Sequence, residues 1–328
     1  MNEQQALLDD MTGTLFAELG HKSALSEAWP KIEELGLTAL LVGEAEGGFG
    51  GSWQDALIVF RHSGYHALSL PVVEAIVAAH VGSALGFQGR GTTAMGSDGS
   101  LEANRFVGTV SGVAAGEGAA FVVAPLADGG SVVIALDEAS VTASKTISGE
   151  ASDTVTVDGA RAVGSAIDIF TLGAFARTAQ SAGALDAALA LSAGYVNERK
   201  QFGKPLAKFQ AVQQNLATFA CEAAAANCAA IAAAQALDRG DGGFEVAAAK
   251  LRCNRAVGIS TAIAHQAHGA IGFTEEYPLH PLTRRLWAWR SEFGNDSYWA
   301  EKLGTLVCAR GADNFWPDLA LLTDSLAA

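Results

Sequence analysis

Apolar positions in the first quarter of the chain recur at helical spacing. A second helical pattern begins at Ala28 and runs up to Gly43, and the glycine-rich stretch 43–52 predicts a loop after it. Two further apolar stretches, 55–64 and 71–85, have the length of helices. We therefore expect an N-terminal helical domain over residues 1–88. The residues that define its first helix are Leu7, Leu8, Met11, Leu15, Phe16 and Leu19.

The pattern changes to short β-branched runs between residues 89 and 165. These runs read FVGTVSGV, AAFVVAPL, SVVIAL and TVTVDGA, and glycine-rich or acidic turns separate them. Val, Ile and Thr are enriched in strands, where their branched side chains pack on a pleated surface. We expect a small β domain over residues 89–165.

Helical patterning returns from residue 166 and continues to residue 328. Long stretches rich in Ala and Leu are interrupted at KQFGKP, DRGDGG and GFTEEYP. Phe209, Val212, Leu216 and Phe219 step by three or four residues and so share one helix face. The sequence predicts a mainly α protein with a small β domain, in which residues 166–328 form a helical bundle.

Charge and composition exclude several classes of partner. The 328 residues carry a formal net charge of −14, which disfavours nucleic acid and anionic lipid because both need clustered Lys and Arg. The N-terminus is polar and acidic, unlike a signal peptide. The Ala-rich stretch 223–236 contains Asn227 and Gln235, so we interpret it as a soluble helix. We expect a cytoplasmic protein that binds neither membrane nor nucleic acid.

Cysteine and histidine spacing gives no indication of a metal site. The four cysteines lack CxxC spacing, and His265, His268 and His280 do not form a ligand-like set. We interpret the cysteines as reduced core residues and expect no metal. They are Cys221, Cys228, Cys253 and Cys308.

Three segments resemble the acyl-CoA dehydrogenase family. They are NERKQFGKPLAKFQAVQQNLA at 197–217, HQAHGAIGFTEEYPLHPLTRR at 265–285 and AWPKIEELGLTALLVGEAEGGFGG at 28–51, and they occur in the family's order. The resemblance implies N-terminal helices, a middle β-barrel-like domain and a C-terminal four-helix bundle. It also implies FAD as cofactor and an acyl-CoA thioester as substrate, which loses its α-hydrogen as a proton and its β-hydrogen as a hydride.

The same resemblance implies a set of cofactor-binding residues that reach the ADP half of a neighbouring subunit's FAD. Arg199 offers planar donors to phosphate oxygens, Gln266 offers an amide, and Gly269 lets the backbone come close. Phe202 can cover a ring face, and Gln210 is a further polar contact at the start of a helix. In the alternative interpretation, Arg199 is a solvated charge at a helix end and Gln266 a surface amide.

The family's catalytic base has no clear counterpart. Abstraction of a thioester α-proton needs a carboxylate beside the substrate. The two positions where the family places this glutamate correspond to Phe293 and Gly173, neither of which is acidic. Glu292 lies one residue away and is the candidate catalytic residue that remains.

The loop that holds the flavin ring in the family is also altered. Gly96, Ser97 and Asp98 remain, but the preceding Thr-Glu-Pro is missing, so we expect an ordinary turn there. These departures resemble the short subunit of heteromeric α2β2 bacterial steroid-type acyl-CoA dehydrogenases. That resemblance implies a longer partner subunit that supplies the base, a steroid side-chain acyl-CoA as substrate and an electron-transfer flavoprotein as acceptor.

Two alternatives remain open at this point. The chain could be a self-sufficient homotetrameric dehydrogenase that uses Glu292, or a non-catalytic scaffold of the same fold. Fatty or aromatic acyl-CoA substrates are also compatible with the sequence.

Overall fold

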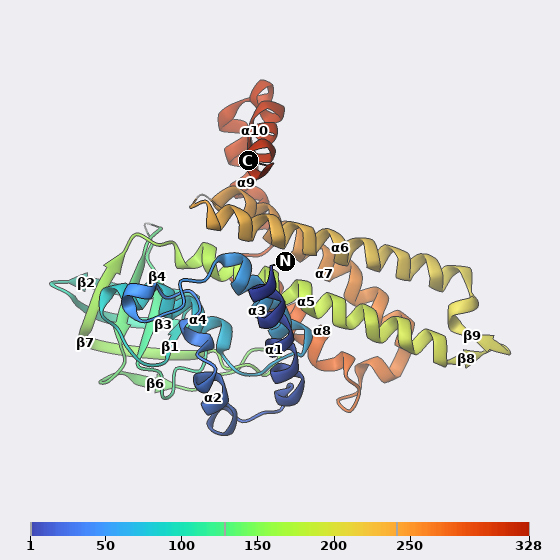
Figure 1. The fold of residues 1–328 in the computed structure, drawn as a ribbon, viewed down its shortest axis with the longest axis horizontal. Helices are drawn as coiled ribbons and strands as arrows, with labels where there is room; N and C mark the ends of the chain where they lie inside the picture. The colour runs from blue at the N-terminus through green and yellow to red at the C-terminus, as the bar shows by residue number, and fades with distance from the viewer. Residues whose placement is uncertain (1, 128, 241, 328) are drawn as a thin grey trace.

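The computed structural model describes residues 2–127, 129–240 and 242–327. A group of N-terminal helices and a β sheet lie at one side, and long helices extend away from them (Figure 1). The predicted fold class, mainly α with a small β domain, is confirmed.

The N-terminal helices begin at sequence-encoded caps. The Asn2 side chain accepts from the Gln5 amide, and Ser52 accepts from the Asp55 amide, each in a reciprocal capping box. Apolar faces of these helices share one core with the nearest parts of the C-terminal helices. The helices are α1 (Glu3–Leu19), α2 (Leu25–Glu34), α3 (Trp53–Tyr65) and α4 (Val72–Gly82).

The second helix is shorter than the sequence pattern predicted. The apolar pattern runs to Gly43, but α2 ends at Glu34. Gly36 adopts a left-handed φ of 66°, which stops the helix, and a short 3₁₀ turn at Leu37–Ala39 follows. The apolar residues after Gly36 are still buried, so their periodicity reflects core packing and not a continuous helix.

The β domain is built around one long strand. Strand β7 pairs with β5 at its C-terminal part and with β3 along most of its length, giving the order β1-β4-β5-β7-β3-β2 with β6 also on β7. Only the β1–β4 pairing is parallel among the strands described. The strands are β1 (Gly91–Thr93), β2 (Gly96–Glu102), β3 (Arg105–Val113), β4 (Phe121–Pro125), β5 (Ser131–Ala135), β6 (Ser140–Thr142) and β7 (Asp153–Ser165).

The expected turn at Gly96–Asp98 is wrong, because these residues begin β2. They pair in register with β3, and Asp98 lies opposite Thr109. The Ser97 hydroxyl donates to the Pro125 carbonyl at 2.5 Å, which ties this strand to β4. The glycine-containing triplet is therefore part of a ladder.

Three long helices, α5, α6 and α7, form the body of the C-terminal domain. A two-stranded hairpin, β8 (Lys200–Gln201) with β9 (Lys204–Pro205), joins α5 to α6 at the end of the bundle remote from the sheet (Figure 1). The helices of this domain are α5 (Ile169–Glu198), α6 (Gln210–Asp238), α7 (Gly243–His268), α8 (Leu279–Ser291), α9 (Asp296–Arg310) and α10 (Phe315–Ala327).

Small residues let the helices approach closely. A Cβ on Gly64 of α3 would lie 1.8 Å from the Gln180 carbonyl oxygen of α5, and one on Gly183 would lie 1.9 Å from that of Arg61. Helix α6 is long and apolar enough to pass a length-and-composition test for a membrane span. It packs on the bundle through buried Ala223, however, as a helix of this fold would.

The interpretation of the cysteines as core residues holds for one of them. All four are free thiols, but Cys253 alone is buried, whereas the other three are exposed. Cys221 and Cys228 lie on the outer face of α6, because this helix buries mainly one stripe of alanines.

Candidate functional site

Arg177 stands at the centre of a buried polar cluster between the β domain and the helices. It lies in the third turn of α5, on a helix that is otherwise apolar or small there. A buried guanidinium needs partners because an unpaired charge in the interior is strongly disfavoured. The structure supplies them from three different segments of the chain.

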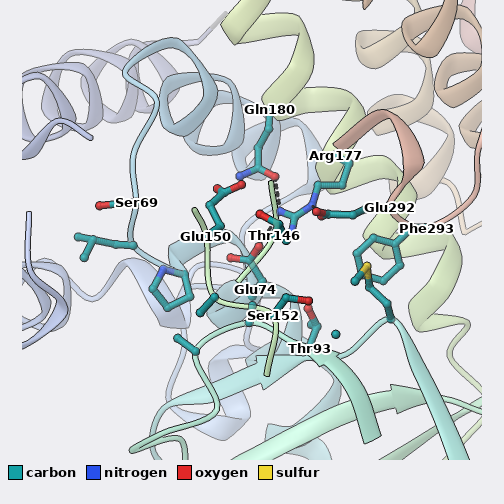
Figure 2. A pocket seen from close by; sticks show the side chains of 17 residues that line it. Ser69, Glu74, Thr93, Thr146, Glu150, Ser152, Arg177, Gln180, Glu292 and Phe293 are labelled. Carbon is teal, nitrogen blue, oxygen red and sulfur yellow. Dashed lines mark hydrogen bonds and ion pairs between the residues drawn. The ribbon is translucent and has the colours of Figure 1, made fainter. Parts of the chain in front are cut away.

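Two carboxylates and one amide surround the guanidinium. Nη1 of Arg177 donates to Glu74 of α4 at 2.6 Å and to the Gln180 amide oxygen at 2.6 Å, and Nε donates to Glu292 at 2.7 Å (Figure 2). Gln180 in turn donates to the Ser63 hydroxyl at 3.0 Å. The cluster therefore links α3, α4, α5 and the segment after α8.

A third carboxylate reaches the cluster from the loop before β7. Glu150 accepts from Arg285 of α8 at 3.3 Å and faces the Arg177 charge. Burial raises the pKa of Glu150, whereas the neighbouring arginines oppose that rise. Glu292 and Glu74 raise the pKa of Arg177 above its ordinary value in spite of its burial, so this guanidinium stays charged.

The cavity beside this cluster is almost filled. Figure 2 shows Arg177, Glu292 and Phe293 projecting into it from one side, above Thr93 of the sheet. The space left is about 40 Å³, room for a few water molecules. Pockets for organic ligands usually have about 300–1,000 Å³. The described residues thus leave no room here for a flavin ring together with a thioester.

The two positions at which the sequence lacks the family's base pack against each other. A Cβ on Gly173 would lie 2.4 Å from the Phe293 ring, so the ring occupies the space that a side chain at position 173 would need. Phe293 has a left-handed φ of 50°, and its carbonyl accepts from Trp299 Nε1 at 3.0 Å. Phe170 covers the ring edge, with 5.8 Å between centroids.

Glu292, the candidate base, points into the cluster and is 8% exposed. Its Oε2 is the acceptor of the Arg177 Nε bond, so a guanidinium occupies the oxygen that would take up a substrate proton. The geometry gives Glu292 an electrostatic role toward Arg177.

A buried lysine holds the helix that leads to Glu292. Lys250 of α7 is 1% exposed and donates to Asn254 Oδ1 at 2.8 Å and to the Trp289 and Arg290 carbonyls of α8 at 2.8 and 3.3 Å. These carbonyls are orphan acceptors at a helix C-terminus. Burial lowers the pKa of Lys250 to about 7.

A second, open pocket lies at the hairpin end of the bundle. It has a volume of about 540 Å³, and Arg199, Gln266 and Gly269 all line it, together with Tyr195 and Asn215. Arg199 caps the C-terminus of α5, where its amide donates to the Tyr195 carbonyl at 2.8 Å. Gly269 follows α7 with a φ of 66°, and a Cβ there would meet nothing within 4 Å.

The other two predicted cofactor residues lie beside this pocket and not in its wall. Phe202 forms the hairpin tip, is 88% exposed and has a left-handed φ of 52°. Its ring meets Phe209 edge-on at 6.1 Å. Gln210 is exposed at the first position of α6. The structure thus brings three of the five together and leaves two projecting outward.

Sequence reasoning missed the Arg177 cluster. One signal was available, because Arg177 is the lone charge between Asp168 and Asp186 in an apolar helical run, and such a charge is rarely buried without a partner. Glu74 gives a similar signal within the apolar stretch of α4. Nothing local linked either residue to Glu150 or Glu292.

Comparisons with known proteins agree with this architecture. Residues 162–301 match the family described as acyl-CoA dehydrogenase, C-terminal domain. Glutaryl-CoA dehydrogenase of Desulfococcus multivorans is 39% identical over 124 residues, which cover 37% of this chain and 31% of that protein. Acyl-CoA dehydrogenase FadE34 of Mycobacterium tuberculosis strain H37Rv is 29% identical over 335 residues, which cover 92% and 46%. The matches thus span a third to a half of these relatives' length.

Solved structures share the fold across nearly the whole chain. A Tcur3481–Tcur3483 steroid ACAD variant superposes with a TM-score of 0.83 at 24% identity, covering 95% of this chain and 99% of that one. The ChsE4–ChsE5 complex of Mycobacterium tuberculosis gives 0.80 at 21% identity, covering 93% and 97%. Residues 162–301 thus match the acyl-CoA dehydrogenase C-terminal domain, and the chain as a whole shares the fold of these acyl-CoA dehydrogenase structures.

Proposed function

We propose that this chain takes part in FAD-dependent α,β-dehydrogenation of an acyl-CoA thioester as a subunit without its own catalytic base. It completes the flavin site of a longer partner. One contrast carries the proposal: the pocket at the hairpin end is open, with about 540 Å³, while the cavity between the domains is closed to about 40 Å³.

The hairpin-end pocket fits the ADP half of FAD. The described residues contain no carboxylate within ion-pair distance of Arg199, which leaves its planar donors for pyrophosphate oxygens. The Gln266 amide can serve ribose or phosphate, and the open side of Gly269 admits a close backbone approach. Phe202, exposed at the hairpin tip, is placed to cover a ring that belongs to a neighbour.

The cavity between the domains does not fit the reactive half of FAD, the flavin ring. Thr93, Met95 and Gly112 close the sheet side, and the Arg177 cluster fills the helix side. Bound FAD would take up the β-hydrogen as a hydride, which requires ring and substrate to meet in one cavity. Because Glu292 is held by Arg177, we assign the proton-abstracting carboxylate to the partner.

The shape of the molecule separates the two halves of the site. The β8–β9 hairpin lies at the end of the bundle remote from the sheet, so one chain cannot bring Arg199 and its own β domain to the same cofactor (Figure 1). A second subunit of the same fold can bring its own cavity to this hairpin, as symmetric and pseudosymmetric pairs do.

Substrate and partners follow from the neighbours' descriptions. One solved relative is described as a steroid ACAD and another as a complex of two different chains, each similar in fold to this chain. On that basis we propose a heterotetramer with a longer acyl-CoA dehydrogenase subunit and a steroid side-chain acyl-CoA as substrate. An electron-transfer flavoprotein is the proposed acceptor, and the cytoplasm the proposed location.

The flavin-to-protein ratio of the purified chain, alone and co-expressed with the longer subunit, tests this proposal. We expect little flavin alone and about one FAD per heterodimer, since each subunit holds a different half of the cofactor. Arg199→Met in the heteromer should lower flavin retention at least about tenfold. The matched control, Arg310→Met, removes an exposed arginine on α9 and should leave flavin content unchanged.

Stoichiometric FAD and full turnover from the chain alone would exclude the division of labour. In that case Glu292→Gln is the next variant, because a self-sufficient enzyme would lose proton abstraction and keep its flavin. Equal flavin content in wild type and the Arg199→Met heteromer would instead favour a scaffold without a cofactor role.

A further inference from the structure

One loop of the β domain separates two hollow spaces of very different size. The loop covers residues 143–152, between β6 and β7, and we refer to it as the flap. Behind it lies the closed cavity of about 40 Å³, and in front of it lies an open groove of about 1120 Å³. Thr146 lines only the cavity, Lys145 and Gly149 line only the groove, and Glu150 lines both. The flap is therefore the partition between the two spaces.

The flap is folded back on itself and anchored at its base. The Ser152 amide donates to the Ser144 carbonyl at 2.9 Å, and the Thr146 amide donates to the Glu150 carbonyl at 2.9 Å. Below these bonds, the buried Asp153 carboxylate accepts from the Ser144 amide at 3.1 Å. Because its internal bonds do not depend on the rest of the molecule, the flap can move as one piece about this base.

Polar contacts from α8 hold the flap over the cavity. Arg284 donates Nε to the Ile147 carbonyl at 2.6 Å, and its Nη2 donates to the same oxygen. Arg285 donates Nε to Glu150 at 3.3 Å. In the part of the chain that the structure describes, no residue of 143–152 joins a hydrophobic core cluster, and Ile147 is 65% exposed. Segments with few buried apolar contacts open at a lower free energy than the core does.

Burial disfavours the charge of Glu150 when the flap is closed. Burial is the largest influence on this carboxyl and raises its pKa, and the opposing charges of Arg285 and Arg177 do not cancel that rise. An ionised carboxylate with a raised pKa is more stable in solvent than in its buried position. The bond to Arg285 therefore holds the flap closed against a cost of desolvation.

The other walls of the cavity are fixed more firmly. Leu70 and Phe293 belong to the hydrophobic core that the N-terminal and C-terminal helices share. Thr93 lies in strand β1, which pairs with β4. The flap is thus the wall with the least apolar anchoring.

We propose that the flap is a lid on the cavity, which Arg284 and Arg285 hold closed and which opens transiently to join the cavity to the groove. The closed cavity has room only for water, so a larger molecule reaches Arg177 only while the flap is open. This inference goes beyond the proposed function, which concerns the cofactor pocket at the hairpin end and the closed state of this cavity.

Thiol labelling of a cysteine placed behind the flap measures its opening. Thr93→Cys is the reporter, because Thr93 is 4% exposed and lies in the cavity wall on the sheet (Figure 2). Thr92→Cys is the matched reporter, because Thr92 is 0% exposed, faces the other side of the same strand and is not part of this wall. Both are made in the full chain with the three exposed cysteines replaced by serine and treated with a small methanethiosulfonate reagent.

We expect Thr93→Cys to react at least about tenfold faster than Thr92→Cys, whose exposure requires the sheet itself to open. Arg284→Met removes bonds to the flap without touching the core, and should raise the Thr93→Cys rate at least about fivefold. The Thr92→Cys rate should not change.

A second variant weakens the flap without altering α8. Gly149 has a left-handed φ of 89°, and a Cβ there would meet nothing within 4 Å. Gly149→Ala therefore strains the closed turn without a clash, and should raise the Thr93→Cys rate at least about threefold. Arg105→Met is the matched control: Arg105 is also exposed and donates to a backbone carbonyl, that of Gly159, and its removal should leave the rate unchanged.

Equal rates for the two reporters in every variant would show that the flap is a fixed wall and would overturn the proposal. So would a fast Thr93→Cys rate that neither Arg284→Met nor Gly149→Ala changes, since the cavity would then open by another route. An equal acceleration by Arg105→Met would assign the effect to general loosening and would also overturn it. None of these measurements uses flavin, so a failure here leaves the flavin-ratio test of the proposed function intact.

Discussion

Arg177 shows how one residue can determine what a cavity holds. Its guanidinium is 2.6 and 2.7 Å from two buried carboxylates contributed by α4 and by the segment after α8. A pair of this kind contributes little net stability compared with apolar packing, but removal of one partner leaves buried charges without compensation. The main effect of Arg177 is therefore to keep the cavity closed, and its net contribution to the stability of the fold is small.

Arg177→Met should destabilise the protein by about 3–5 kcal/mol, because Glu74 and Glu292 lose their counter-charge. Urea unfolding at neutral pH measures the loss. Arg252→Met, which breaks a more exposed pair with Glu222, is the control and should cost about 1 kcal/mol or less. Equal losses in the two variants would contradict the role assigned to Arg177.

Lys250 makes stability depend on pH above neutrality. Its pKa is lowered by burial to about 7 in the folded chain, while the unfolded chain keeps the ordinary value near 10.5. Between these values the unfolded state binds more protons, so stability should rise with pH, by up to about 1.4 kcal/mol per unit. The useful window is about pH 7 to 8.5, below the titration of Cys253, whose pKa burial raises to about 11.

Thermal or urea unfolding across that window checks the slope. Lys250→Met should flatten it, because the side chain no longer titrates, whereas Lys302→Met on the surface should leave it as in wild type. A slope that persists in Lys250→Met would assign the effect to other groups.

At the scale of elements, close backbone contact between α3 and α5 holds the N-terminal helices to the bundle. Gly64 and Gly183 face each other's helix at distances that exclude any Cβ. Helix α5 makes this contact, and it also contains Arg177 and ends at Arg199.

Gly183→Ala should force α3 and α5 apart, since the new methyl would lie 1.9 Å from a backbone oxygen that cannot rotate away. We expect a loss of at least about 1–3 kcal/mol in chemical unfolding, typical of overpacking. Gly194→Ala in the same helix meets nothing within 4 Å and should be neutral or slightly stabilising. A neutral Gly183→Ala would show that the helix contact is loose.

Sequence patterns predicted the helices and strands better than they predicted which residues would meet in the folded chain. Helical and β-branched periodicities indicated the right fold class. Local motifs identified Arg199, Gln266 and Gly269, which line one pocket in the structure. The length of α2 was overestimated because apolar residues after Gly36 are buried without being helical. The Arg177 cluster could not be predicted, since its three carboxylates are 27 to 115 residues from Arg177 along the chain and meet it only through tertiary packing.

At the scale of the whole molecule, the two ends differ in how open their cavities are. The hairpin end offers an open pocket with Arg199 in its wall, and the sheet end has a closed cavity behind an open groove. The hairpin and the sheet lie at opposite sides of the chain (Figure 1).

Because Phe293 packs into the space beside Gly173, a change at either position alone is unfavourable. A glutamate at position 293 would place a further acid beside Glu74, Glu150 and Glu292 and leave a void where the ring had been. A mutation at position 173 would collide with the ring that is already there. Each single substitution is therefore unfavourable while the other residue stays as it is, so the two positions can change only together.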